Sequence, residues 1–138
     1  MSEKAKPLPV FDEISRAWFA AAAEGKLLIQ RSRSTGRFQF YPRAHSLGTL
    51  LADLEWIEAS GRGRLHTFTV VERTANPEFA EDCPYILAIV ALEEGPLVTT
   101  RIVDIPANAL WCDMPVRVVF RDLADGIVAP FFTGIEAT

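Results

Sequence analysis

The 138-residue sequence predicts a mainly β protein, in which one N-terminal helix precedes an antiparallel barrel that is closed or nearly closed. One segment near the N-terminus has apolar residues at helical spacing. Everything after it consists of short apolar or alternating runs separated by turn residues, which is the pattern of strands. No helical segment stands between these runs, and this favours an antiparallel barrel of five or six strands over a parallel α/β sheet.

The helix is predicted between residues 11 and 24. Its apolar positions recur every three or four residues, namely Phe11, Ile14, Trp18, Phe19 and Ala22. Asp12 and Glu13 fall in its first turn, where carboxylates oppose the positive end of the helix dipole. Gly25 follows and supplies a left-handed cap. The residues before the helix are polar and carry two prolines, which is typical of a loose tail.

Eight runs are candidate strands: Leu27–Arg31, Arg37–Tyr41, Leu54–Ala59, Arg64–Glu72, Tyr85–Leu92, Leu97–Val103, Val116–Phe120 and Ile127–Phe132. Turn residues separate them, as at Ser60-Gly61-Arg62-Gly63 and Glu94-Gly95-Pro96. The run at 85–92 is almost wholly apolar, so we expect a central strand buried on both faces. The run at 116–120 alternates with arginines, as in a strand with one wet face. Asp125-Gly126 predicts a hairpin between the last two strands.

Residues 27–56 have the spacing of a zinc ribbon but lack its ligands. Ser32-x-x-Thr35 and Ser46-x-x-Thr49 occupy the positions at which two C-x-x-C pairs would hold zinc. Hydroxyls are poor zinc ligands beside thiolates, so no metal is expected here. We expect packing of the aromatic residues Phe38, Phe40 and Tyr41 to hold this hairpin in place of a metal.

The charge pattern argues against a nucleic-acid surface. The net charge is −4 and the sequence pI is about 5.2, whereas such surfaces neutralise phosphates with cations. One stretch nevertheless carries four arginines with no acid among them, and it suits either a small anionic ligand or a solvated basic face: Arg31, Arg33, Arg37 and Arg43. No apolar run approaches the roughly 18 residues of a membrane span, and no secretory leader stands at the N-terminus, so a cytoplasmic protein is expected. Cys83 and Cys112 are interpreted as separate, buried thiols.

Across nearly its whole length the chain resembles the zinc-ribbon/OB-fold acyl-CoA-associated proteins, long catalogued as a domain of unknown function. The matching pieces are Phe11-x6-Trp18-Phe19, Glu24-Gly25-Lys26-Leu27, Thr35-Gly36-Arg37, Tyr41-Pro42-Arg43, Glu55-Trp56-Ile57-x-x-Ser60-Gly61-Arg62-Gly63, Phe68-Thr69-Val70-Val71, Pro84-Tyr85-x-x-Ala88, Leu92-x-Glu94-Gly95-Pro96, Met114-Pro115-Val116 and Pro130-x-Phe132. Two departures matter. The ribbon cysteines are absent, and Asp113 stands where the family usually has glycine, although Asp tolerates a left-handed backbone.

The resemblance implies three units: a tail and helix at 1–26, a degenerate zinc-ribbon hairpin without metal at 27–53, and an OB-fold barrel at 54–138. It also implies a non-catalytic accessory subunit in lipid or acyl-CoA metabolism. Such a subunit would bind acyl-CoA beside a thiolase-like, aldolase-like or hydratase enzyme. The four arginines would then face the CoA phosphates, and an apolar wall would come from the aromatic residues Trp18, Phe19, Phe38, Phe40 and Tyr41. Trp18 and Phe19 are equally explained as a core contact of the helix.

Three alternatives stay open. Ser60-Gly61-Arg62-Gly63 is either an anion-binding loop, with amides exposed by its glycines, or a plain hairpin connection. The chain could be an OB module for single-stranded nucleic acid, although the barrel half has few cations. It could also be a small independent CoA-ester hydratase or thioesterase that uses His66 or Glu94, but His45 and His66 lie in different modules and no catalytic constellation is evident. Self-association is left open.

Overall fold

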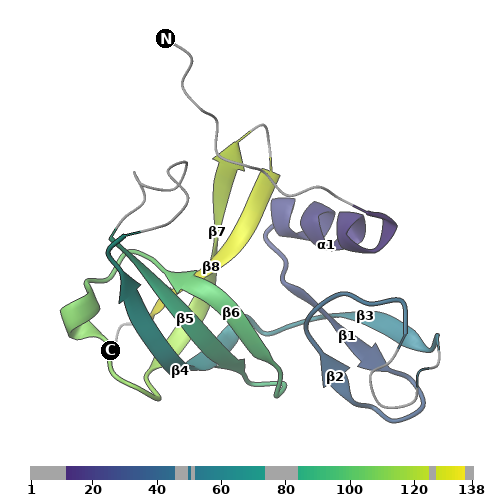
Figure 1. The fold of residues 1–138 in the computed structure, drawn as a ribbon. Coiled ribbons are helices and arrows are strands. Elements are labelled where there is room, and N and C mark those ends of the chain that lie inside the picture. The colour runs from purple at the N-terminus through teal and green to yellow at the C-terminus, as the bar shows by residue number, and fades with distance from the viewer. Residues whose placement is uncertain (1–11, 46–49, 51, 74–83, 125–126, 136–138) are drawn as a thin grey trace.

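In the computed structural model, the residues described are 12–45, 50, 52–73, 84–124 and 127–135. They form one α-helix, a three-stranded sheet of order β2-β1-β3, and a closed barrel of order β4-β5-β6-β8-β7. We call the three-stranded sheet and its loops the finger. The finger and the barrel lie side by side, with the helix near the point where they meet (Figure 1). The mainly β architecture with one N-terminal helix and a five-stranded OB-type barrel confirms the predicted fold class.

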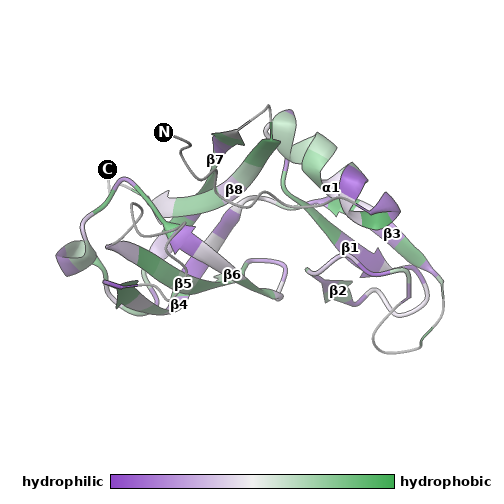
Figure 2. Ribbon diagram, turned by 45° about the horizontal axis from the view of Figure 1, so that its top comes forward, coloured by the Kyte–Doolittle hydropathy of each residue, from purple (hydrophilic) through white to green (hydrophobic). Residues whose placement is uncertain are grey.

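Helix α1 (Glu13–Ala23) begins at a capping box and ends at a left-handed glycine. The Ser15 amide donates to the Asp12 carboxylate at 2.7 Å, and the Asp12 amide donates back to the Ser15 hydroxyl at 3.0 Å. These hydrogen bonds from Ser15 hold the pKa of the Asp12 carboxyl below its usual range. Gly25 has φ of +79° and ends the helix as predicted. The helix contacts β8 of the barrel and β1 of the finger, and its apolar turns lie toward β8 (Figure 2).

The finger consists of β1 (Leu28–Ser32), β2 (Phe38–Gln39) and β3 (Leu54–Glu58), all antiparallel. The sequence predicts that the barrel begins at residue 54 and so includes β3 in it. The structure instead places β3 in the three-stranded sheet. Strand β3 pairs along its length with β1, from Leu28 opposite Glu58 to Ser32 opposite Leu54. The barrel therefore begins at β4, and β3 is the third strand of the finger.

The barrel strands are β4 (Arg62–Val71), β5 (Tyr85–Leu92), β6 (Leu97–Ile102), β7 (Pro115–Ala124) and β8 (Ile127–Gly134). Four of the five seams are antiparallel, as predicted. The seam between β6 and β8 is parallel, with Ile102 opposite Phe132, and it closes the barrel. The turn at Asp125-Gly126 lies outside the described residues, but β7 and β8 pair antiparallel on either side of it.

The barrel core is made by the inward face of each strand, including Leu65, Val90, Val116 and Phe132, all of which are fully buried. The expectation that β5 is buried on both faces is wrong. Its residues alternate, with Ile86 inside and Leu87 38% exposed, because no element of the described chain covers the outer face of the barrel here. The alternation predicted for β7 is confirmed by buried Val116 and exposed Arg117.

Two local predictions have opposite outcomes. Asp113 adopts φ of +74°, so it fills the left-handed position in which the resembled family has glycine. Cys112 is exposed, which corrects its interpretation as a buried thiol, because it lies in the turn that precedes β7. Cys83 lies outside the described residues. Among the helices that the structure describes, none has the length and apolar character needed to cross a membrane.

Candidate functional site

A groove of about 450 Å³ lies between the finger and the barrel. The finger contributes Gly36, Arg37 and Phe38, and the turn between β5 and β6 contributes Glu94, Gly95 and Pro96. The Ser60 amide donates to Glu94 Oε2 at 2.8 Å, which holds this carboxylate at the junction. Its other oxygen, Oε1, is shielded from solvent and accepts no hydrogen bond from the described residues. The groove therefore has an exposed cation, Arg37, on its finger side and the turn that contains Glu94 on its barrel side.

The structure divides the four candidate arginines into two pairs. Arg31 donates to Glu55 Oε1 from Nε at 2.9 Å and from Nη2 at 2.5 Å, and its guanidinium lies 5.9 Å from the Phe38 ring centroid. Arg33 Nε lies 3.6 Å from Glu55 Oε2. Glu55 therefore lies close to both of them, although its single negative charge balances only one, and the sequence places it 24 residues from Arg31. Arg37 and Arg43 are exposed and form no ion pair with any described residue, and only Arg37 lines the groove.

The aromatic residues predicted as a ligand wall mostly pack on one another between helix and finger. Trp18 lies edge-to-face against Phe19 at 4.8 Å and against Phe40 at 6.0 Å, measured between ring centroids. The Trp18 Nε1–H donates to the Leu28 carbonyl at 3.0 Å, which satisfies the polar atom of the indole. Phe40 is buried, whereas Tyr41 is 53% exposed. These contacts are those of a core, and Phe38 is the aromatic residue of this set that lines the groove.

The Ser60–Gly63 loop has the geometry of a tight connection into β4. Gly61 has φ of +79°, and a Cβ there would lie 2.5 Å from Val118 Cγ1, so only glycine fits. The Ser60 amide already donates to Glu94, and the Arg62 amide donates to the Ser60 hydroxyl at 3.2 Å. Two of the amides that an anion would need are thus already engaged.

A hydrogen-bonded cluster occupies the first of the two degenerate knuckles. The Ser32 hydroxyl, which is almost fully buried, donates to Asp53 Oδ2 at 2.8 Å, and the Ser34 hydroxyl donates to the same oxygen. The Ser34 amide also donates to Oδ2 at 3.2 Å, and the Thr35 amide donates to the Ser32 hydroxyl at 3.3 Å. The Arg33 amide donates to the Asp53 carbonyl at 2.9 Å. One carboxylate thus organises the loop between β1 and β2.

This cluster does not fit a zinc ion. Ser32 and Thr35 offer neutral hydroxyls in place of thiolates, and the Ser32 hydroxyl is already committed to Asp53. The described part of the chain contains no group of three or more His, Cys, Asp or Glu that could hold a metal. Ser46 and Thr49, the second pair of vestigial positions, lie outside the described residues. The donor set around Ser32 is therefore that of a hydrogen-bonded turn.

The electrostatics of the cluster follow from its donors. Hydrogen bonds from the hydroxyls of Ser34 and Ser32 hold the pKa of the Asp53 carboxyl below its usual range. A second polar contact lies further along the same face of β1, where Gln30 Oε1 accepts hydrogen bonds from the Arg43 amide at 2.9 Å and from the Gln39 side chain at 3.0 Å. Gln30 also donates to the Arg43 carbonyl at 2.9 Å. The hairpin is therefore held by polar side chains near both of its ends, in addition to the aromatic packing that the sequence predicts.

The histidines do not form a catalytic arrangement. His45 is exposed in the finger, and His66 is exposed at a β-bulge where the register of β4 against β5 shifts between Leu65 and Thr67. Within the described residues, the carboxyl groups with a shifted pKa are Asp12, which caps α1, and Asp53, which accepts hydrogen bonds from Ser34 and Ser32.

The arrangement of helix, finger and OB barrel defines the class of protein, that of zinc-ribbon and OB-fold two-module proteins. Residues 19–46 match the family model of the rubredoxin-like zinc ribbon domain of ChsH2, and residues 56–121 match the model of its C-terminal OB-fold domain. The two matches together span more than half of the chain. The first takes in the end of α1 with β1 and β2, and the second begins within β3 and ends within β7. The chain belongs to the DUF35 family.

Named relatives agree with this assignment. The chain is 39% identical over 80 residues to a DUF35 domain-containing scaffold protein of Methanothermobacter thermautotrophicus, covering 55% of this chain and 59% of that protein. It is 27% identical over 127 residues to a probable enoyl-CoA hydratase alpha subunit of Thermomonospora curvata, covering 92% of this chain and 39% of that protein. The chain therefore spans between 39% and 59% of the length of these two relatives.

Solved structures show the same fold. A chain from the structure of the Ltp2–ChsH2(DUF35) aldolase has a TM-score of 0.81 at 26% identity, covering 92% of this chain and 98% of that one. A DUF35 protein of unknown function from Sulfolobus solfataricus has a TM-score of 0.60 at 8% identity, covering 89% of this chain and 86% of that one, and at this identity it supports the fold alone.

Proposed function

We propose that this chain is a non-catalytic accessory subunit, which holds an acyl-CoA in the groove between finger and barrel for a partner enzyme. The partner would be a thiolase-like, aldolase-like or hydratase protein. The observation that carries the proposal is the likeness, over 92% of the chain, to a chain of the Ltp2–ChsH2(DUF35) aldolase. The names of the relatives, a scaffold protein and an enoyl-CoA hydratase subunit, point in the same direction.

The chemistry of the groove is compatible with parts of coenzyme A. Arg37 offers an exposed cation for a phosphate, and Arg–phosphate pairs are strong because they are bidentate and charge-assisted. Phe38 offers an apolar surface beside it. Arg31 is less available for the phosphate role that the sequence suggested, because its guanidinium already pairs with Glu55.

The ligand part of the proposal is tested by calorimetric titration of the chain with CoA, acetyl-CoA and a longer acyl-CoA. We expect saturable binding that Arg37→Gln weakens about tenfold, the factor that corresponds to losing about 1.4 kcal/mol of charge-assisted contact. Arg16→Gln, which removes an exposed arginine on α1 away from the groove, is the matched control. An absence of affinity for every CoA ester, with and without the partner enzyme, would contradict the proposal.

The partner part is tested by native mass spectrometry of the protein isolated from its own source. This one measurement reports the partner, the stoichiometry, any bound CoA and the zinc content. We expect one CoA-ester enzyme in a fixed ratio and no stoichiometric zinc. Turnover of an acyl-CoA by the isolated chain, lost in His66→Ala or Glu94→Ala, would establish an independent enzyme instead. A low-salt gel shift with single-stranded nucleic acid is expected to be negative, because the net charge is −4.

A further inference from the structure

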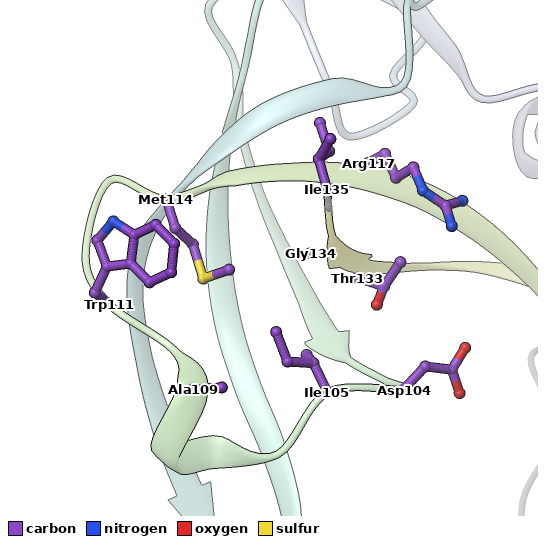
Figure 3. Close-up of a pocket in the computed structure, with 9 residues that line it drawn as sticks. All are labelled: Asp104, Ile105, Ala109, Trp111, Met114, Arg117, Thr133, Gly134 and Ile135. Atoms are coloured by element: carbon purple, nitrogen blue, oxygen red, sulfur yellow. The ribbon is translucent and has the colours of Figure 1, made fainter. Parts of the chain in front are cut away.

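A larger hollow, of about 680 Å³, lies at one end of the barrel and outside the finger–barrel groove. Figure 3 shows that it has two unlike halves. The indole of Trp111 and the side chains of Met114 and Ile105 lie on one side, and Arg117, Thr133 and Asp104 lie on the other. Its volume falls in the range of roughly 300–1,000 Å³ that is usual for small-molecule sites.

An ordered backbone holds the apolar half of this hollow. The Asp113 amide donates to the Leu65 carbonyl at 2.6 Å, and the Leu65 amide donates to the Met114 carbonyl at 2.9 Å, so the turn after Trp111 is fixed to β4. Met114 is 2% exposed and forms part of the floor, whereas Trp111 is 58% exposed on the rim. A large apolar side chain is therefore presented to solvent on a fixed frame, next to an apolar floor.

Glycine keeps this floor open. A Cβ on Gly134 would lie 3.0 Å from Ile105 Cδ1 and 3.3 Å from Met114 Cε, so any side chain there would crowd the space between them. Asp104 and Asp113 stand on either side of the connection that carries Trp111, and both adopt positive φ, of +63° and +74°. Asp adopts this left-handed conformation more readily than most residues, so both turns are held without replacing these side chains by glycine.

The polar half carries the cation Arg117, which has no counterion among the residues that the structure describes. Arg117 lies directly opposite Arg62 in the register of β7 against β4, and like charges in this position repel. Neither guanidinium forms an ion pair with a carboxylate of the residues that the structure describes. Asp104, the nearby acid, is paired with Arg121. An anion bound at Arg117 would relieve the repulsion between the two arginines.

We propose that this hollow is a binding site for a small apolar anion, namely a carboxylate carried on a hydrocarbon body. The hydrocarbon would lie against Trp111, Met114 and Ile105, and the carboxylate would pair with Arg117 beside the Thr133 hydroxyl. The site is independent of the acyl-CoA proposal, because it uses other residues on another part of the barrel. Loss of either function would therefore leave the other in place.

Octanoate is the test ligand, and the chain provides two built-in reporters. It has three tryptophans and two methionines, so the Trp111 indole and the Met114 methyl give NMR signals that can be assigned by substitution. We expect octanoate to shift both signals saturably. The Trp18 indole, bonded to the Leu28 carbonyl, should not move. Octyltrimethylammonium, which has the same chain length and the opposite charge, should bind at least about tenfold more weakly.

Two substitutions test the contributions of charge and of apolar contact to octanoate binding separately. Arg117→Gln should weaken octanoate binding about tenfold, whereas Arg16→Gln should leave it unchanged. Trp111→Ala should also weaken it, as measured at the Met114 methyl. Because both side chains are exposed, neither change threatens the fold. The proposal is overturned if octanoate gives no saturable shift, if the cationic amphiphile binds as well as octanoate, or if Arg117→Gln binds octanoate as tightly as the native chain.

Discussion

Different interactions stabilise the finger and the barrel. The interior of the barrel is apolar, with Leu65, Val90, Val116 and Phe132 fully buried and each strand paired on both sides. The finger has few buried apolar residues, and its hairpin is closed by polar contacts around Asp53 at one end and Gln30 at the other. In a zinc ribbon, the metal supplies much of the folding free energy of so small a unit.

This difference indicates how a ribbon-like module that lacks the zinc cysteines can be stabilised. In the finger, the Asp53 carboxylate accepts hydrogen bonds from the loop between β1 and β2. Trp18 of the helix packs on Phe40 and adds an apolar contact between the helix and the finger. The stability of the barrel is therefore expected to depend on burial, whereas that of the finger should depend on ionisation. Each prediction below changes one side of this contrast and uses the other side as its control.

The largest effect is expected from the barrel core. Phe132 is fully buried at the closing seam, so Phe132→Ala should reduce the free energy of unfolding by about 3–5 kcal/mol. The loss should appear as a lower midpoint in a urea titration followed by circular dichroism. Leu123→Ala, at a 41% exposed position on β7, is the control and should change the midpoint little. An equal loss in both variants would mean that the barrel does not depend on its interior.

The next effect is local to the finger. Asp53→Asn keeps the shape of the side chain but removes the charge that attracts three donors, so the loop between β1 and β2 should open more often. Hydrogen exchange should accelerate several-fold at the amides of Arg33, Ser34 and Thr35. Exchange in β5 should stay the same.

Asp122→Asn, which removes an exposed carboxylate from β7, is the matched control for the change in net charge. A chelator such as EDTA should leave the protection of the finger amides unchanged in the native chain. If EDTA accelerates their exchange while Asp53→Asn does not, then a metal closes the finger.

A low pH should destabilise the finger before it destabilises the barrel. The pKa of Asp53 is lowered in the folded chain, so its contribution is fully present above the unfolded value of about 3.9 and is lost as the pH falls through the lower folded value. We expect the Ser34 amide signal to titrate below about pH 4 in NMR spectra, together with loss of protection in the finger. In Asp53→Asn this titration should disappear, whereas the titration of the Asp12 cap on α1 should persist. If the barrel loses its hydrogen-exchange protection before the finger as the pH falls, the proposed difference between the two modules is wrong.

The smallest effect on stability is expected from the arginines. Arg31→Gln breaks a half-exposed ion pair with Glu55 and should reduce the free energy of unfolding by about 1 kcal/mol or less. Arg37→Gln should leave the unfolding midpoint unchanged, because Arg37 has no ion-pair partner among the described residues. For CoA binding the order of the two effects should be reversed: Arg37→Gln should weaken binding more than Arg31→Gln does. Thermal melts and the same CoA titration measure both effects.

The sequence was sufficient to predict the elements, because helix and strand periodicities are local. The helix with its Gly25 cap and the alternating strand β7 were predicted for this reason. Strand β3 was assigned to the wrong sheet, since only its pairing with β1, which is distant in sequence, shows where it belongs. The pairing of Arg31 with Glu55 and of Ser32 with Asp53 is equally non-local, at separations of 24 and 21 residues.

The hollow at the end of the barrel had a weak signal in the sequence. Trp111 is a large aromatic residue within a short connection that lies outside every candidate strand. Nothing in the sequence indicates whether such a residue folds inward or stays on the surface, because exposure depends on the neighbours that the fold supplies. The closeness of Arg62 to Arg117 likewise follows from strand register alone.

The contact of α1 with β8 joins the first helix of the described chain to its last strand. During synthesis the helix emerges well before that strand, so its apolar turns have no barrel surface to cover until β8 has been made. The finger also depends on this helix through Trp18, and its completion should therefore wait for the barrel to close. Unlike an ordinary zinc ribbon, which can fold as soon as it captures its ion, this finger would be among the last parts of the molecule to become ordered.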